Sequence, residues 1–227
     1  MEYSWDPNKY FDLVENTSSP ILQKYMRVEL DYLINNIINP KDKTFIDVGA
    51  GVGRVIPKLS AISKGVIAVE LDKQMLGALK KRSERYSNVL VVRGDAQELS
   101  EALKDFNIDK PVIFSLQNSL GTPYGNPYKI ISEMIKIAKN NGELIISLFI
   151  QEGLKDYGIS IYNSVPGLTG EPDLDRTDFA NGIFISKTGY QSHWWTIEER
   201  EEILEMIGGS LVAEIKEDYF YILHVKY

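Results

Sequence analysis

The chain alternates between short apolar runs and segments with helical periodicity. Five apolar runs predict strands, at residues 45–48, 66–70, 89–93, 112–116 and 144–149. Helical patterns follow the first four of them, at residues 55–63, 73–86, 98–106 and 127–139. This alternation predicts a mostly parallel sheet with helices on both faces.

The two ends of the chain complete this pattern. Residues 8–38 are largely helical in pattern, with Ser19 as a cap and Pro20 at the first helical position. A helix is predicted from Thr196 to about residue 207, followed by strands at residues 211–215 and 219–225. The link between these strands is too short for a parallel crossover, so the last strand is predicted to be antiparallel. The fold class is therefore α/β, with a Rossmann-like, seven-stranded, mostly parallel sheet.

Glycines and prolines interrupt the pattern between residues 151 and 190. An irregular stretch of this length inside a compact domain is usually functional or flexible. We therefore predict one domain over residues 1–227, with an N-terminal helical lid at 1–40 and a substrate-side insertion at 151–195.

Composition excludes several function classes. The net charge of −7 and the pI of about 5.0 disfavour a nucleic-acid partner, which usually requires a basic face. With no cysteine and two histidines in the chain, we expect no metal site. No apolar run is long enough to span a bilayer, and the N-terminus lacks the pattern of a secretory signal, so a cytoplasmic location is expected. A homodimer is left open.

A glycine-rich turn directly after the first predicted strand is the strongest functional signal. Asp47 lies near the end of the strand, and Gly49, Gly51 and Gly53 follow it before the next helix. Such a turn lets the backbone approach a ligand closely. Glu70 follows Asp47 by 23 residues, near the spacing of an acid that accepts both ribose hydroxyls. The sequence therefore predicts a site for a nucleoside cofactor.

Three segments, each at the end of a strand, resemble the motifs of class I S-adenosylmethionine-dependent methyltransferases. They are Asp47-Val48-Gly49-Ala50-Gly51-Val52-Gly53, residues 69–76 and residues 94–99. The resemblance implies S-adenosylmethionine as cofactor. It implies cofactor binding by Asp47, Gly49, Ala50, Gly51, Glu70, Leu71, Asp95, Ala96 and Leu116.

The resemblance also implies which part of the cofactor each of these residues would bind. Asp47 would bind the cofactor ammonium, Glu70 the ribose hydroxyls and Asp95 the adenine amino group. Leu71 would pack on the adenine ring, which the Ala96 amide would face. A plainer interpretation is that Asp47 and Asp95 only cap helices.

A dinucleotide-binding Rossmann domain is the nearest competitor. Its fingerprint is G-x-G-x-x-G, and counting from Gly49 the third glycine would fall at Arg54. The C-terminal hairpin also favours the methyltransferase interpretation.

The segment after the fourth strand carries information about the methyl acceptor. Leu116-Gln117-Asn118-Ser119 is similar to a segment of glycine- and sarcosine-type N-methyltransferases, which suggests Asn118 as a substrate residue. Those enzymes have an arginine after the fifth strand, and residues 148–151 contain none. Alternatively, Asn118 only caps the following turn.

Three further residues are candidates for the acceptor site. His193 is a candidate base for a hydroxyl or amine acceptor. Trp194 is a candidate wall of the acceptor pocket, although a tryptophan pair such as Trp194 and Trp195 is more often core packing. Tyr10, in the predicted lid, is a candidate contact to cofactor or substrate. His224, within an apolar strand, is predicted to be a hydrogen-bonded structural residue.

The predicted function is transfer of a methyl group from S-adenosylmethionine to a nitrogen or oxygen of a small-molecule acceptor. Two alternatives remain, a protein or RNA methyltransferase and a non-catalytic module that binds the cofactor.

Overall fold

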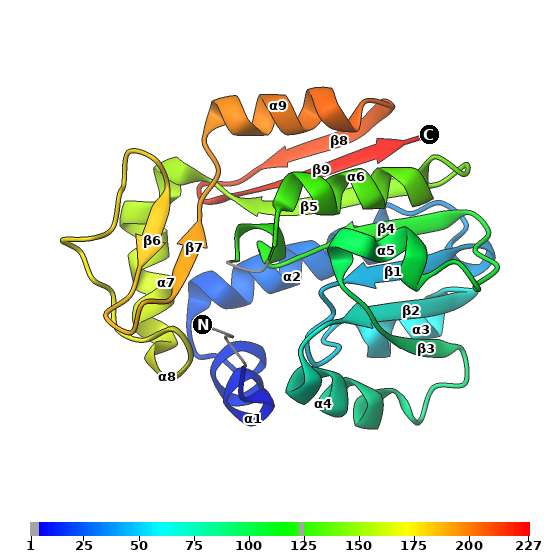
Figure 1. The fold of residues 1–227 in the computed structure, drawn as a ribbon, viewed down its shortest axis with the longest axis horizontal. Coiled ribbons are helices and arrows are strands. Elements are labelled where there is room, and N and C mark those ends of the chain that lie inside the picture. Colours follow the sequence, from blue (N-terminus) through cyan, green and yellow to red (C-terminus); the bar gives the residue numbers. More distant parts are fainter. Residues whose placement is uncertain (1–4, 123–124) are drawn as a thin grey trace.

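The fold is described here from a computed structural model, which covers residues 5–122 and 125–227. Within these ranges seven strands form the main sheet: β1 (Thr44–Val48), β2 (Gly65–Glu70), β3 (Val89–Arg93), β4 (Pro111–Ser115), β5 (Glu143–Phe149), β8 (Ser210–Lys216) and β9 (Phe220–Lys226). Their order is β3-β2-β1-β4-β5-β9-β8 (Figure 1). β9 is antiparallel to both of its neighbours, and the other neighbours in the sheet are parallel. This topology confirms the predicted fold class.

The central strands are apolar because both of their faces are covered. All residues of β4 and β5 are buried, as are residues 45–48 of β1. The chain runs outward from β1 to β3 and then returns to β4 on the other side of β1. The switch point of the sheet therefore lies at the carboxyl ends of β1 and β4, where such sheets bind ligands.

Two groups of helices cover the two faces of the sheet (Figure 1). One face packs against α2 (Pro20–Asn35), α3 (Ile56–Ile62) and α4 (Lys73–Ser83). The other face packs against α5 (Leu99–Ala102), α6 (Pro127–Ala138) and α9 (Ile197–Ile207). The predicted caps form, since Ser19 accepts from the Leu22 amide and Thr196 makes a capping box with Glu199.

Some predicted helices are shorter than the pattern suggested. The helix expected at residues 98–106 is a 3₁₀ turn, η3 (Ala96–Glu98), followed by the single-turn α5. Asp95 caps η3 by accepting from the Gln97 amide at 2.8 Å. A second short 3₁₀ turn, η4 (Ser119–Gly121), follows β4, and a third, η2 (Pro40–Asp42), precedes β1.

The N-terminal segment and the segment after β5 lie next to each other beside the sheet (Figure 1). The first contains α1 (Pro7–Tyr10) and the π-helical turn η1 (Phe11–Glu15), and the first four residues of the predicted lid lie outside the described residues. The segment after β5 has more regular secondary structure than its glycines and prolines predicted. It contains η5 (Gln151–Gly153), η6 (Leu154–Gly158), α7 (Ile159–Ser164), α8 (Pro166–Thr169), and the paired strands β6 (Ile183–Ile185) and β7 (Gln191–His193).

Aromatic packing explains why the insertion is ordered despite its turns. The Tyr162 ring stacks on Phe184, and the Trp194 ring stacks on Phe149 of β5. Trp194 Nε1 also donates to the Tyr162 hydroxyl at 2.9 Å. These contacts join residues far apart in the sequence, so local periodicity does not reveal them.

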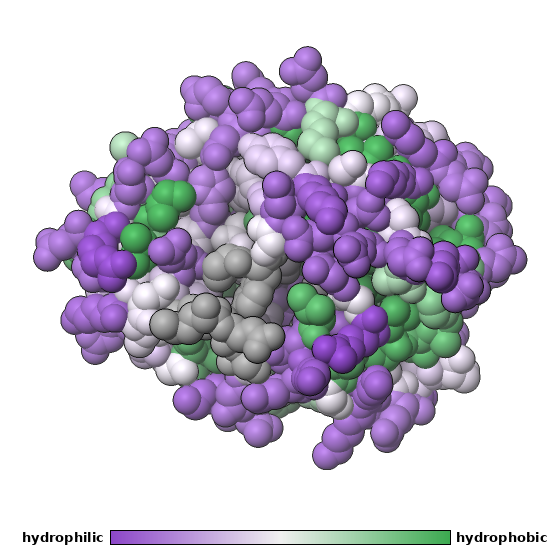
Figure 2. Space-filling view, in the orientation of Figure 1, coloured by the Kyte–Doolittle hydropathy of each residue, from purple (hydrophilic) through white to green (hydrophobic). Residues whose placement is uncertain are grey.

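His224 in β9 is a buried structural residue, as predicted. Its Nδ1 lies 2.8 Å from the Tyr32 hydroxyl, and its Nε2 lies 2.9 Å from Glu143. The surface in Figure 2 is mainly hydrophilic, and no helix among residues 5–122 and 125–227 is long and apolar enough to cross a membrane.

Candidate functional site

The turn between β1 and α3 depends on its glycines. Gly49, Gly51 and Gly53 all have positive φ, at 78°, 56° and 81°. A Cβ on Gly53 would lie 2.6 Å from a methyl group of Leu79, whereas a Cβ on Gly51 would meet nothing within 4 Å. Gly53 therefore serves packing against α4, and Gly51 leaves open space beside the backbone.

Glu70 joins this turn to the end of β2. Its carboxylate accepts from the Gly51 amide at 2.7 Å and from the amides of Leu71 and Asp72, both at 2.8 Å. Burial raises the pKa of Glu70 above its ordinary value, and the three amides act in the opposite direction. Glu70 thus holds a fixed orientation at the edge of the turn.

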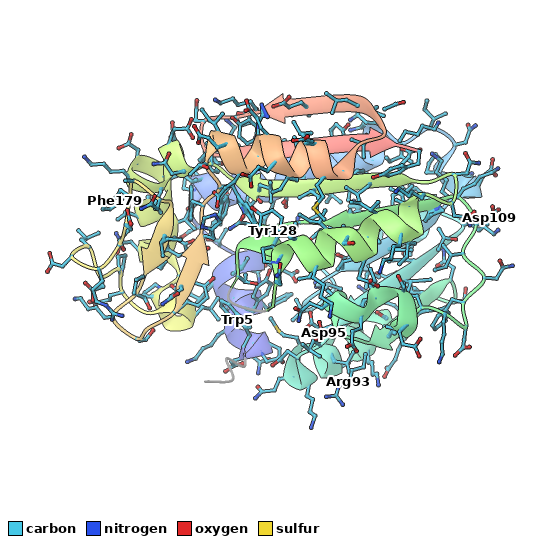
Figure 3. All side chains as sticks on the ribbon, turned by 45° about the horizontal axis from the view of Figure 1, so that its top comes forward. Trp5, Arg93, Asp95, Asp109, Tyr128 and Phe179 are labelled. Carbon is cyan, nitrogen blue, oxygen red and sulfur yellow. The ribbon has the colours of Figure 1, made fainter. Side chains whose placement is uncertain are left out.

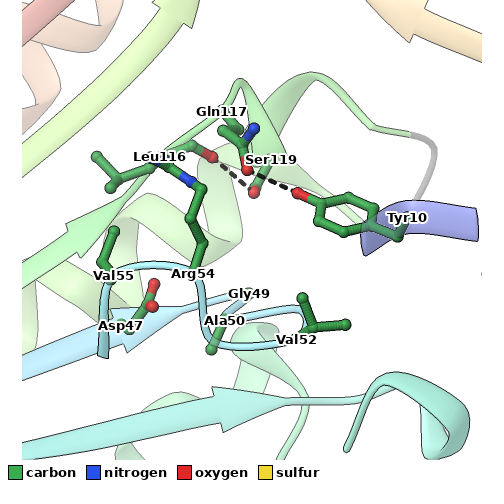
Figure 4. A pocket seen from close by; sticks show the side chains of 10 residues that line it. All are labelled: Tyr10, Asp47, Gly49, Ala50, Val52, Arg54, Val55, Leu116, Gln117 and Ser119. Atoms are coloured by element: carbon green, nitrogen blue, oxygen red, sulfur yellow. Dashed lines mark hydrogen bonds between the residues drawn. The ribbon is translucent and has the colours of Figure 1, made fainter. Parts of the chain in front are cut away.

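A small cavity lies between the glycine turn and the loop after β4 (Figure 4). It is lined by Tyr10, Asp47, Gly49, Ala50, Val52, Arg54, Val55, Leu116, Gln117 and Ser119. Asp47 is only 5% exposed, and no hydrogen-bond donor among the described residues reaches its carboxyl group. Burial raises the pKa of Asp47 to about 7, although the Arg54 guanidinium acts to lower it. This carboxyl group lacks the partner that a cationic ligand would supply.

A buried network joins the walls of the small cavity. Glu29 of α2 accepts from Arg54 Nη2 at 2.7 Å and from the backbone N–H of Gln117 at 2.6 Å. Arg54 Nη1 donates to the Met26 carbonyl at 3.0 Å, and the Tyr10 hydroxyl donates to Gln117 Oε1 at 2.6 Å (Figure 4). The network fixes Gln117, whose backbone is left-handed with a φ of 52°.

The sequence patterns did not predict that Glu29, Arg54 and Gln117 form one hydrogen-bonded network. A signal was present for Glu29, because an acid within the apolar face of a helix must find a partner when buried. Nothing local indicates that this partner is Arg54, or that Glu29 also holds the Gln117 amide.

A second, larger cavity of about 700 Å³ adjoins the small one, and Tyr10, Gly49, Gln117 and Ser119 line both. One end is formed by the ends of β2 and β3, including Glu70 and Asp95. The other end is formed by the N-terminal helices and the insertion, including Trp5 and Tyr190. Trp5 and Asp95 mark these two sides in Figure 3.

The N-terminal helices span the large cavity. α1 packs against both α4 and α8, and the centroids of the Trp5 and Tyr190 rings lie 5.6 Å apart. Glu15 of η1 forms a two-pronged ion pair with Arg82 of α4, at 2.6 and 2.7 Å. The N-terminal segment is thereby fastened to the cofactor side of the sheet and to the insertion.

All residues predicted to bind the cofactor line one of the two cavities. The small cavity contains Asp47, Gly49, Ala50 and Leu116, and the large one contains Gly49, Gly51, Glu70, Leu71, Asp95 and Ala96. Tyr10, predicted to contact cofactor or substrate, lines both.

The other predicted acceptor residues lie elsewhere. Asn118 Oδ1 accepts from the Phe149 amide at 3.1 Å and from Trp195 Nε1 at 3.0 Å, and its Nδ2 donates to the His193 carbonyl at 2.9 Å. Trp194 is fully buried. His193 Nε2 lies 2.9 Å from both carboxylate oxygens of Glu199. None of the three lines either cavity, so the geometry gives their predicted roles no support.

Residues 46–146 match the family model described as methyltransferase domain. One curated relative is the probable ribosomal RNA small subunit methyltransferase A of Methanosarcina acetivorans, 27% identical over 164 residues. The match covers 66% of this chain and 53% of the relative, so the chain spans about half the length of that protein.

Solved structures of similar fold cover nearly the whole chain. The PH0226 protein of Pyrococcus horikoshii gives a TM-score of 0.67 at 18% identity, covering 96% of this chain and 98% of its own. A SAM-dependent methyltransferase from Aquifex aeolicus gives a TM-score of 0.59 at 17% identity, covering 97% and 98%.

The methyltransferase domain matched over residues 46–146 and the shared fold agree with the predicted enzyme class and with the predicted cofactor. The resemblance to glycine and sarcosine N-methyltransferases stays a prediction.

Proposed function

We propose that this chain is a class I S-adenosylmethionine-dependent methyltransferase that transfers a methyl group to a nitrogen or oxygen of a small molecule. The observation that carries the proposal is the shape of the joined cavities. The acids at the ends of β1, β2 and β3 line one side, while the N-terminal helices and the insertion roof the other. A roofed cavity of about 700 Å³ suits a small acceptor.

The cofactor side of the cavities fits S-adenosylmethionine. Asp47 would bind the ammonium group, which would supply the cationic partner that its buried carboxyl group lacks. Glu70, held by three backbone amides, would accept from the ribose hydroxyls. Asp95 would accept from the adenine amino group, and Leu71 would pack on the ring. Gly51 leaves the backbone open where the ligand passes.

When bound, S-adenosylmethionine supplies an electrophilic methyl group on a sulfonium. Transfer forms a bond from the acceptor nitrogen or oxygen to the methyl carbon, breaks the carbon–sulfur bond, leaves the electron pair on sulfur and releases a proton from the acceptor. The chain's own contribution is to align the acceptor and to exclude water. The N-terminal lid, which we assign to residues 1–40, and the insertion at 151–195 would do both.

An RNA acceptor is the second candidate, since the curated relative is described as a ribosomal RNA methyltransferase. Its match covers only 53% of that relative, and the roof over the cavity leaves less room for a nucleotide strand than an open cleft would.

Two measurements test the proposal. First, isothermal titration calorimetry should show micromolar binding of S-adenosylhomocysteine and no binding of NAD. Second, the protein should transfer label from S-adenosyl-[methyl-³H]methionine to the small-molecule fraction of a cell extract of the source organism. The RNA and protein fractions serve as parallel acceptors, and Glu70→Ala serves as the inactive control. Label in the RNA fraction alone would replace the first candidate with the second.

A further inference from the structure

The acceptor end of the large cavity carries no charged side chain among the described residues. Charged lining residues are confined to the cofactor end: Glu70, Asp72, Lys73, Arg93 and Asp95. The acceptor end, which the N-terminal helices and the insertion cover, is called the roofed end. It is lined mainly by apolar and aromatic side chains, among them Trp5, Tyr25, Phe149, Ile161, Leu168 and Tyr190.

The nearest buried charges are already engaged or lie on the cofactor side. Arg54 and Glu29 pair with each other at 2.7 Å, and Asp47 lies in the small cavity, where the cofactor ammonium is expected. A carboxylate or ammonium group on the acceptor would therefore enter the roofed end without a partner. Burying an unpaired charge is strongly unfavourable, whereas a neutral polar group needs only one or two hydrogen bonds.

Gln117 differs from the other polar side chains that line both cavities, because the Tyr10 hydroxyl and the Ser119 hydroxyl each donate to a partner within the protein. Gln117 lines both cavities, and its Oε1 accepts from the Tyr10 hydroxyl at 2.6 Å. No acceptor among the described residues binds its Nε2, which leaves an amide N–H able to donate to a ligand. A neutral hydroxyl oxygen matches that donor, because it can accept the hydrogen bond with one lone pair and keep the other for the methyl carbon.

Resting on the function proposed above, we propose that the acceptor is an uncharged molecule with a flat apolar body and a hydroxyl group that binds Gln117. The aromatic side chains hold the body, and Gln117 holds the polar atom beside the transferred methyl group. This disfavours free amino acids such as glycine and sarcosine, because their carboxylate would find no cation among the described residues that line the roofed end.

The test uses protein saturated with S-adenosylhomocysteine and four probes that share one ring system, titrated by calorimetry at pH 7. They are 2-naphthol, naphthalene, 2-naphthoate and 2-naphthylmethylammonium. We expect 2-naphthol to bind at least tenfold more tightly than either ion, and more tightly than naphthalene. Equal or tighter binding of an ion, or no binding of 2-naphthol, would overturn the inference. Failure of S-adenosylhomocysteine itself to bind would instead refute the proposed function.

Two test variants and one control variant locate the effect. Leu168→Lys places a cation at the roofed end and should strengthen 2-naphthoate binding at least tenfold. Leu174→Lys, on the same insertion but 56% exposed and outside the cavity lining, is the matched control and should leave the ranking unchanged. In Gln117→Leu, 2-naphthol should lose its advantage over naphthalene, a difference that a general loss of packing would not produce. Affinity for S-adenosylhomocysteine reports the folding of each variant.

Discussion

Protonation of Asp47 should control cofactor affinity across the neutral pH range. Asp47 is the last residue but one of β1 and is 5% exposed, and burial raises the pKa of its carboxyl group to about 7. The groups that act on it are Arg54, which lowers its pKa, and Glu70 and Glu29, which raise it. The cofactor ammonium interacts favourably with the ionised form, so binding below pH 7 must expel a proton from Asp47.

The size of the effect follows from this pKa. The apparent Kd grows with the protonated fraction of Asp47, so it should be about 30-fold higher at pH 5.5 than at pH 8. The ligand's own ammonium group stays charged over this range. The sign is fixed by the direction of the shift: a raised carboxyl pKa disfavours the ionised form that the ligand needs, so affinity falls as pH falls.

Calorimetry with S-adenosylhomocysteine at pH 5.5, 6, 7 and 8 checks this expectation. Repeating each titration in two buffers of different ionisation enthalpy counts the protons released, which should approach one at pH 5.5. Asp47→Asn should bind more weakly at pH 8 and should lose most of the slope. A parent protein with a flat profile, or a variant that keeps the full slope, would refute the role given to Asp47.

Three substitutions test the other assignments. Glu70→Ala should weaken S-adenosylhomocysteine binding about 100-fold or more, because charged hydrogen bonds contribute about 1.5–3 kcal/mol each. Glu70→Gln should lose less affinity. If calorimetry shows that Glu70→Ala binds as tightly as the parent protein, the ribose assignment is contradicted. Asn118→Ala should lower the free energy of unfolding by about 2–4 kcal/mol in urea titrations, with ligand affinity kept, because the side chain loses its hydrogen bonds to the Phe149 amide, Trp195 and the His193 carbonyl. Unchanged stability with lost turnover would restore its substrate role. His193→Asn should leave methyl transfer within about threefold of the parent rate, since a general base contributes about 100-fold or more and His193 contacts Glu199 instead.

The cofactor side of the protein could be predicted because its signals are local. The strand at Val89–Arg93 lies where its β-branched run indicates. Asp47, Glu70 and Asp95 each lie at or just after the carboxyl end of a strand, which is why the sequence pattern could identify them. A parallel sheet brings such strand ends to one edge, so the sequence order alone puts the three acids near one ligand.

The acceptor side could not be predicted in the same way, because its contacts are not local. The Glu29–Gln117 hydrogen bond joins residues 88 positions apart, and the Trp5–Tyr190 contact joins the N-terminal segment to the insertion. Asn118 and Trp194 were reasonable candidates by their neighbours in sequence. Their buried partners, Trp195 and Tyr162, are what the sequence does not reveal.

Because the cofactor side and the acceptor side are built from different parts of the chain, the relatives give information about the cofactor but little about the acceptor. The matched methyltransferase domain covers residues 46–146 and contains the glycine turn with the three acids. Most of the roofed end is built from residues outside that range, such as Trp5, Tyr25 and Ile161. Shared ancestry of the matched part therefore accounts for a shared cofactor and leaves the acceptor to the unmatched parts. Among the described residues, those parts line the roofed end with uncharged, mostly apolar and aromatic side chains. The proposal of a neutral small molecule rather than a polyanionic RNA therefore rests on these side chains and not on the relatives.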